Sequence, residues 1–134
     1  MEYRVCRNNP APYNDLNGKI SLLGLGTMRL PLRDAADQTS IDEEKAQEIF
    51  DYAYAHGVNY FDTAYPYHGG MSEKFCGKAL AKYPRASYHL ASKLPGWLLK
   101  CDEDVPRIFD EQLANCRTDY FDFYLFHNVC EMNI

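Results

Sequence analysis

Hydrophobic and polar residues fall into blocks along this chain, and the spacing of the apolar positions changes from one block to the next. Short apolar runs at 20–26, 58–61, 88–92 and 119–126 are typical of buried β-strands. The stretches between them carry apolar residues three and four positions apart, which predicts amphipathic helices. Residues 1–19 are polar and contain prolines and a glycine, so we expect an irregular arm there.

Three helices are predicted between the strands. The first has an S-x-x-E capping box at Ser40 and Glu43, and Gly57 suits the left-handed position after its last turn. The second begins near Ser72 and the third at Asp104. The residues expected to face inward on the three helices are Ala46, Ile49, Phe50 and Ala53, then Phe75, Cys76, Ala79 and Leu80, then Val105, Ile108, Phe109, Leu113 and Cys116.

The resulting order, β-α-β-α-β-α-β, predicts an α/β fold with parallel strands and right-handed crossovers. Two architectures compete at this point: an open doubly wound sheet, or the first half of a TIM (β/α)8 barrel. A complete barrel needs about 250 residues, and this chain has 134. We therefore expect one partial domain over residues 1–134, in which the arm at 1–19 precedes four strands and three helices at 20–134.

Composition narrows the class of protein. The net charge of −5 gives little support to a nucleic-acid partner. No apolar run approaches the roughly 20 residues of a membrane span, and no secretory signal is visible, so we expect a cytoplasmic protein without a membrane role. The five cysteines are odd in number and form no CxxC pair, which favours free thiols; the four histidines form no HExxH pair, so no metal site is predicted.

Glycines near the first strand do not form a dinucleotide fingerprint. The G-x-G-x-x-G pattern that starts at Gly24 has Arg29 where the third glycine belongs, and the next helix begins too late to face a pyrophosphate at this turn. An unrelated flavodoxin-like binding domain lacks support for the same reason, since no phosphate-binding glycine turn is evident.

Ionisable residues follow the predicted strands at their carboxyl ends. Asp62 ends the second strand, Lys93 the third and His127 the fourth, and Tyr67 lies five residues after Asp62. In a parallel sheet these ends share one edge. Each residue alone has an ordinary structural explanation, such as a turn acid, a solvated lysine, an aromatic wall or a buried histidine. Their conjunction on one edge is what favours a site.

These four side chains suit proton transfer to a carbonyl oxygen. Asp62 can pair with Lys93 and hold its charge in place. A nearby ammonium favours the phenolate form of Tyr67, so the phenol can donate its proton near neutral pH. His127 can hydrogen-bond and orient the same oxygen. The hydride has to come from a cofactor, because no side chain supplies one.

Several stretches resemble the aldo-keto reductase superfamily. They are GLGTMRLP (24–31), GVNYFDTAYPYHGGMSE (57–73), LASK (90–93) and DYFDFYLFHN (119–128). The resemblance implies a (β/α)8 barrel that reduces aldehydes and ketones with NADPH or NADH and without a metal. It also implies that Asp62, Tyr67, Lys93 and His127 are the catalytic tetrad, with Tyr67 as the general acid.

Further residues receive expectations from the resemblance. Gly26, Thr27 and Met28, together with Asp62, match the part of the family site that approaches the nicotinamide ribose. The pair at 72–73 matches a motif that we expect to cap the second helix. Trp97 is either a wall of the substrate pocket or core packing under its loop.

The second half of the barrel is absent from the sequence, and with it the family's remaining cofactor contacts. The first and last strands would then have unpaired edges, which favour self-association. Two functions follow from these observations. One is a carbonyl reductase in truncated form, and the alternative is a non-catalytic half-barrel that acts as an interaction or regulatory module.

Overall fold

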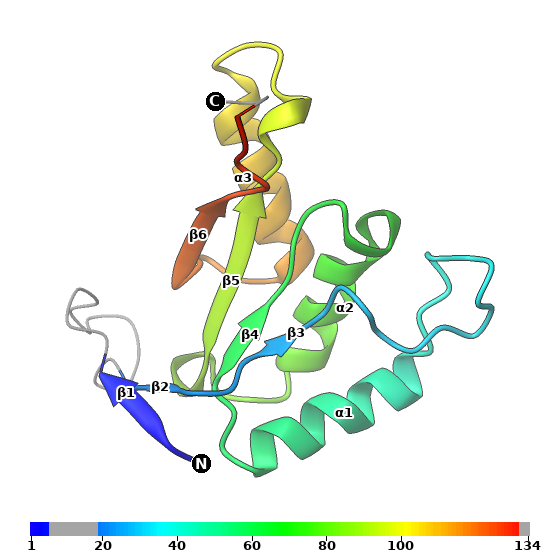
Figure 1. The fold of residues 1–134 in the computed structure, drawn as a ribbon, viewed down its shortest axis with the longest axis vertical. Coiled ribbons are helices and arrows are strands. Elements are labelled where there is room, and N and C mark those ends of the chain that lie inside the picture. The colour runs from blue at the N-terminus through cyan, green and yellow to red at the C-terminus, as the bar shows by residue number, and fades with distance from the viewer. Residues whose placement is uncertain (6–18, 132–134) are drawn as a thin grey trace.

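The computed structural model describes residues 1–5 and 19–131, and its centre is a parallel sheet (Figure 1). The four strands lie side by side in chain order, and each neighbouring pair is parallel. They are β3 (Leu25–Gly26), β4 (Tyr60–Asp62), β5 (His89–Leu94) and β6 (Phe123–Phe126). The carboxyl ends of all four strands therefore lie at one edge of the sheet.

Three helices connect the strands and pack against one face of the sheet (Figure 1). They are α1 (Glu43–Ala55), α2 (Met71–Leu80) and α3 (Asp104–Cys116). Short 3-10 turns interrupt the connections at η1 (Tyr67–Gly70), η2 (Arg85–Ser87) and η3 (Gly96–Leu98). The alternation of strand and helix confirms the predicted parallel (β/α) units.

The first strand and the arm differ from the prediction. The apolar run 20–26 is not one strand but is divided between β2 (Lys19–Ser21) and β3. Within the arm, β1 (Tyr3–Val5) is regular and pairs with β2 in an antiparallel ladder, so the expectation of an irregular arm is wrong for these residues. The rest of the arm, at 6–18, lies outside the described residues.

Local hydrogen bonds explain why the first strand is divided. The Ser21 hydroxyl donates to the Leu23 carbonyl at 2.7 Å, and the Ser21 N–H donates to the Asn59 side-chain oxygen at 2.8 Å. A serine that bonds to backbone nearby competes with the strand ladder. The chain consequently bends after Ser21, and an apolar run alone could not reveal this.

The ends of α1 are set by Asp42 and Gly57. The predicted capping box is wrong, because Asp42 is the N-cap and accepts a hydrogen bond from the Lys45 N–H at 3.3 Å. The Ser40 hydroxyl instead donates to the Asp37 carbonyl at 2.7 Å within the preceding turn. Gly57 has φ +86°, which confirms the left-handed position expected after the last turn.

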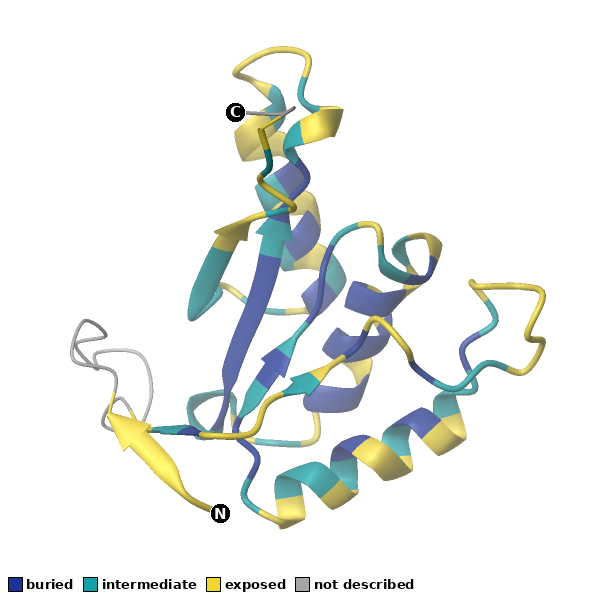
Figure 2. Cartoon of the chain, in the orientation of Figure 1, coloured by how far each residue is buried: buried dark blue, intermediate teal, exposed yellow. Residues whose placement is uncertain are grey.

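The core lies between the helices and the sheet (Figure 2). The Phe50 ring on α1 stacks on Phe61 of β4 at 5.3 Å and meets Phe75 of α2 edge-on at 5.4 Å. The four inward residues predicted for α2 are all buried. Ile49 and Val105, which we expected to face inward, are exposed, because the buried stripe of each helix is narrower than its apolar stripe.

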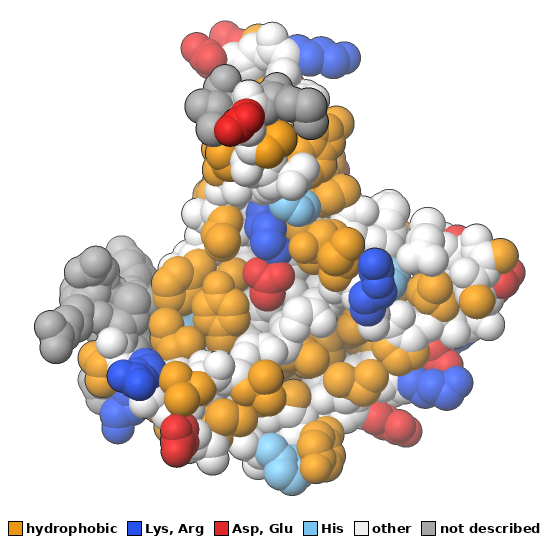
Figure 3. Space-filling view, viewed as in Figure 1, with side chains coloured by type: hydrophobic (Ala, Val, Ile, Leu, Met, Phe, Trp, Pro, Cys, Tyr) orange, Lys and Arg blue, Asp and Glu red, His pale blue; other side chains and the backbone are white. Residues whose placement is uncertain are grey.

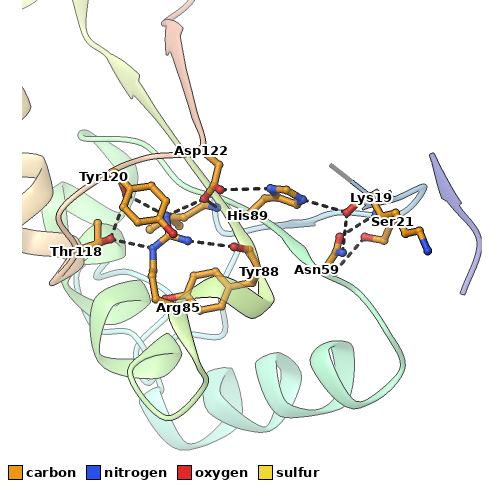
Figure 4. Close-up of polar contacts among 10 residues, drawn as sticks. Lys19, Ser21, Asn59, Arg85, Tyr88, His89, Thr118, Tyr120 and Asp122 are labelled. Carbon is orange, nitrogen blue, oxygen red and sulfur yellow. Dashed lines mark hydrogen bonds and ion pairs between the residues drawn. The ribbon is translucent and has the colours of Figure 1, made fainter. Parts of the chain in front are cut away.

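At the amino end of the sheet, Asp122 is the centre of a buried polar network (Figure 4). Its side chain is 2% exposed. It accepts hydrogen bonds from Arg85 at 2.7 Å and from the Leu90 N–H at 2.8 Å, and His89 Nδ1 lies 3.3 Å away. Burial alone would raise the pKa of Asp122, but the bonds from His89 and Leu90 and the charge of Arg85 lower it below its ordinary value.

The same network reaches the amino-terminal strands. His89 Nε2 lies 3.0 Å from the Lys19 carbonyl, and the Asn59 amide donates to that carbonyl at 3.0 Å (Figure 4). Arg85 also donates to the Tyr120 carbonyl at 2.9 Å, and its guanidinium lies over the Tyr120 ring. Arg85 and His89 thus connect the loop before β6 and strand β2 to the Asp122 carboxylate.

Replacing Asp122 with Asn tests this network. We expect the free energy of unfolding at pH 7 to fall by about 3 kcal/mol, because a buried pair loses one charge. A lowered carboxyl pKa stabilises the fold above the ordinary Asp range, and this stabilisation is lost as the pH falls through the lowered value. The difference between the two proteins should therefore shrink in acid. Urea unfolding followed by circular dichroism measures it.

The matched control for this prediction is Asp110→Asn on the exposed side of α3. It should change the free energy of unfolding by less than about 0.5 kcal/mol. A difference between Asp122→Asn and the parent that stays constant down to the acid limit would contradict the linkage to Asp122.

Candidate functional site

Three of the predicted site residues share one face of the sheet at its carboxyl edge. The register pairs Asp62 of β4 with Ala91 of β5, and Lys93 lies two positions further along β5. Lys93 pairs in turn with Leu125 of β6, and His127 follows two positions later. Since side chains two apart in a strand project from the same face, Asp62, Lys93 and His127 project to the same side.

The ammonium of Lys93 connects two of the other candidate residues. Lys93 is 13% exposed, and its Nζ lies 2.7 Å from Asp62 Oδ1. It also donates to the Thr63 carbonyl at 2.8 Å and lies 3.4 Å from the Tyr67 hydroxyl. The predicted strand ends at residue 92, whereas β5 runs to Leu94, so Lys93 lies within the ladder rather than in a loop. The structure thus brings the predicted amine and phenol together.

The loop after β4 places Tyr67 over this pair. Its N–H donates to the Ala64 carbonyl at 3.1 Å, and the next residue, His68, is buried with φ +53°. His68 Nδ1 lies 2.9 Å from the Gln38 carbonyl, and the Leu30 N–H donates to His68 Nε2 at 3.2 Å. His68 therefore fastens the Tyr67 loop to the loop after β3, a role that the sequence reasoning missed.

His127 completes the group from β6. Its N–H donates to the Leu94 carbonyl at 3.0 Å, which extends the ladder by one bond. The imidazole meets the Tyr67 ring edge-on at 5.7 Å, and its buried Nδ1 has no hydrogen-bond partner among the described residues. Burial, and then the positive charge of Lys93, lower the pKa of His127. The ring is therefore neutral at neutral pH.

Trp97 of η3 lies against His127, with the two ring centres 5.0 Å apart. Its side chain is 48% exposed, so core packing does not account for it. In the space-filling view, cationic, acidic and histidine side chains adjoin one another on this face, with hydrophobic side chains around them (Figure 3).

The predicted cofactor-binding residues lie at the end of β3, beside Asp62. The Thr27 N–H donates to the Asp62 carbonyl at 2.9 Å. The Thr27 side chain is buried and bonds within the protein, whereas Met28 is exposed. A Cβ added at Gly26 would meet no atom within 4 Å, so its face of the strand end is open.

The pair Ser72 and Glu73 does not cap α2, contrary to the prediction. The N-cap is Gly70, which has no side chain to bond, and both Ser72 and Glu73 are buried against the sheet. An acid in the first turn of a helix is ambiguous in sequence, because the same position can serve for capping or be buried. The sequence signal that could have found it is the absence of any Ser, Thr, Asp or Asn at residues 69–70.

Neither a metal centre nor a membrane segment is found in the described part of the chain. No three His, Cys, Asp or Glu side chains there come together in a way that could hold a metal ion. Among the same residues, no helix has the length and apolar character needed to cross a bilayer.

Residues 22–132 match the family model described as the aldo/keto reductase family. Among curated proteins, the chain is 33% identical to L-galactose dehydrogenase from Arabidopsis thaliana, over 83% of this chain and 35% of that protein. It is 30% identical to Protein tas from Escherichia coli, over 87% of this chain and 36% of that protein. The chain thus spans about a third of the length of these relatives.

Solved structures give the same assignment. An aldo-keto reductase from Bacillus halodurans in its holo form has a TM-score of 0.71 and 30% identity, over 93% of this chain and 40% of that chain. One from Klebsiella pneumoniae in complex with NADPH has a TM-score of 0.68 and 26% identity, over 95% and 40%. These structures are (β/α) barrels, so the parallel units here form part of a barrel and not an open doubly wound sheet.

The pKa of His127 should respond to the neighbouring charge. Replacing Lys93 with Met removes a positive charge, so the pKa of His127 should rise; it should still stay below the ordinary value because burial remains. Titration of the imidazole by NMR measures the change. Lys82→Met, which removes a lysine paired with Asp51 on the helical side, is the control and should leave the titration of His127 in place. An unchanged or lower His127 pKa in Lys93→Met would contradict the geometry.

Proposed function

This chain belongs to the aldo/keto reductase family, and we propose that it carries the proton-transfer half of an NAD(P)H-dependent oxidoreductase that reduces aldehydes and ketones to alcohols. The observation that carries the proposal is the position of Lys93 Nζ, 2.7 Å from Asp62 and 3.4 Å from the Tyr67 hydroxyl. A phenol beside a fixed ammonium is a suitable general acid for an oxygen that gains electrons.

Each of the four residues then has a distinct task. Tyr67 donates its proton to the carbonyl oxygen as negative charge develops there. Lys93 stabilises the phenolate that remains, and Asp62 keeps the ammonium in place. His127 hydrogen-bonds the same oxygen through its ring, and its neutral state at neutral pH avoids a second positive charge beside Lys93.

The described residues fit one side of a nicotinamide cofactor. We assign to this role Gly26, whose outer face is open, together with Thr27, Met28 and Asp62, which adjoin it. When bound, the cofactor supplies the hydride that reduces the carbonyl carbon. The relative from Klebsiella pneumoniae, which holds NADPH, supports NADPH as the first choice, with NADH as the alternative.

Trp97 would form part of the wall that faces the carbonyl substrate. Its ring is exposed and lies against His127, so a substrate whose oxygen reaches His127 would contact the indole. An exposed aromatic surface beside polar groups favours an aromatic or apolar aldehyde.

We further propose that residues 1–134 are one partial domain, with an arm at 1–19 and the strands and helices at 20–134, which the rest of a barrel would complete. The described cysteines Cys76, Cys101 and Cys116 are free thiols, which supports a reducing compartment such as the cytoplasm.

The second candidate function is a non-catalytic half-barrel that binds a partner. The observation that favours it is the exposed apolar surface at the β6 edge of the sheet, formed by Leu125, Phe126 and Val129. An exposed strand edge is a template for pairing with another chain or another copy. This function predicts association without turnover.

Replacing Tyr67 with Phe separates the two functions. The purified chain is mixed with NADPH and a reactive aromatic aldehyde, and the absorbance of reduced nicotinamide is followed. We expect turnover that falls by at least about 100-fold in Tyr67→Phe, because general acid catalysis contributes on the order of 10²–10⁴.

Tyr65→Phe is the matched control, since Tyr65 belongs to the same loop but its hydroxyl contacts Glu111 at 3.1 Å. It should retain the activity of the parent chain. Equal turnover in Tyr67→Phe and Tyr65→Phe would exclude Tyr67 as the acid. Absence of both turnover and NADPH binding in the parent would favour the non-catalytic module.

A further inference from the structure

Behind the strand that carries Lys93 lies a buried carboxylate without a cationic partner. Glu73 of α2 is 0% exposed, and no Lys or Arg side chain pairs with it in the described ranges. An unpaired buried charge is costly unless hydrogen bonds satisfy it. The hydrogen bonds of Glu73 therefore have to come from neighbouring elements.

Three donors from two other elements meet the Glu73 carboxylate. Its Oε1 accepts hydrogen bonds from the Ser92 hydroxyl of β5 at 2.7 Å and from the Gln112 amide of α3 at 2.6 Å. Its Oε2 accepts from the Asn115 amide of α3 at 3.2 Å. The carboxylate thus fastens α2, α3 and β5 at a single point.

The donors that bind Glu73 also lie next to the backbone of Lys93. Ser92 precedes Lys93 and projects from the opposite face of β5, as neighbours in a strand do. The Gln112 amide donates not only to Glu73 but also to the Lys93 carbonyl at 3.1 Å. Glu73 orients Gln112, and Gln112 in turn holds the backbone from which the Lys93 side chain extends.

Ser72, the residue before Glu73, contacts the residues that follow β3 and β4. Its hydroxyl lies 2.7 Å from the Thr27 hydroxyl and 2.9 Å from that of Thr63. Thr27 also donates to the Asp62 carbonyl at 3.0 Å. On the far side of the network, the Tyr124 hydroxyl of β6 donates to Gln112 at 2.6 Å. All four parallel strands are therefore tied, near their carboxyl ends, to residues that contact Ser72 or Glu73 directly or through Gln112.

We propose that Glu73 is a positioning residue, which holds the β5 backbone so that the Lys93 ammonium stays between Asp62 and Tyr67. The consequence for carbonyl reduction rests on the proposed function, whereas the position of Lys93 is a property of the folded chain and can be measured without turnover.

The test is Glu73→Gln, which keeps the volume and places an amide donor where three donors already converge. Acetic anhydride labels the 134-residue chain, and mass spectrometry follows acetylation of Lys93. We expect the rate at Lys93 to rise about fivefold, the equivalent of one lost hydrogen bond. Glu44→Gln on the exposed face of α1 is the matched control and should leave the rate unchanged.

A second measurement separates positioning from general loosening of the fold. Cys76 of α2 and Cys116 of α3 are buried, and burial raises the pKa of the Cys76 thiol to about 12, so both should resist alkylation. In Glu73→Gln the two thiols should stay protected while Lys93 becomes reactive. Lys93 and both thiols gaining reactivity together would overturn the proposal, because that pattern reports loss of structure.

Ser92→Ala is the milder second variant, in case Glu73→Gln does not fold. It removes one donor to Glu73 and one acceptor of the Gln112 amide at 2.9 Å, but leaves the bonds from Gln112 to Glu73 and to the Lys93 carbonyl, so the rate at Lys93 should rise by a smaller factor with protected thiols. No change at Lys93 in a folded Ser92→Ala and a folded Glu73→Gln overturns the proposal. In an active chain, Glu73→Gln should lower kcat more than it changes KM. If the parent chain lacks turnover, the proposed function fails, while the labelling result still decides the role of Glu73.

Discussion

The ion pair between Lys93 and Asp62 is the interaction on which the candidate site depends. It joins two neighbouring strands at the open edge of the sheet, where the lysine side chain is largely shielded from water. In that setting an ammonium needs an acceptor for its hydrogen bonds, and the acid at the end of β4 supplies one at 2.7 Å. The Lys93 ammonium lies within 3.4 Å of the Tyr67 hydroxyl, and its charge lowers the pKa of His127.

The polar residues at the two ends of the sheet differ in their hydrogen bonding. At the amino end, Asp122, Arg85 and His89 bind the loop before β6 and the antiparallel strand β2 into the domain. Each of these three side chains is hydrogen-bonded within the protein, which is typical of a network that stabilises a fold. At the carboxyl end, one ring nitrogen of His127 has no hydrogen-bond partner within the part of the chain that the structure describes, and Trp97 is exposed. In barrel enzymes, residues at the amino face serve stability and residues at the carboxyl face serve chemistry.

A second polar layer lies between the sheet and the helices. The hydroxyls of Thr27, Thr63 and Ser72 and the carboxylate of Glu73 occupy positions that hydrophobic residues could fill with less cost of desolvation. Hydrogen bonds have directions, whereas apolar contacts do not. A polar layer can therefore specify the relative positions of strand ends within a fraction of an ångström, which a reactive site needs.

The sequence by itself determined the parallel (β/α) order, the left-handed turn at Gly57 and the candidate residues at the strand ends, because these depend on periodicity and on local backbone rules. It also located Asp62, Lys93 and His127 on one edge, since parallel strands leave no other place for them. Tertiary structure decided the features that depend on competing partners. The chain bends after Ser21, where Asn59 is close enough to accept a hydrogen bond from the Ser21 N–H, and Asp42 rather than Ser40 caps α1. Glu73 turns inward because donors from α3 and β5 meet it there, and Ser72 because the hydroxyls of Thr27 and Thr63 lie within hydrogen-bond distance. A polar side chain has several possible partners along the chain, and only the packed fold selects which of them lies within reach.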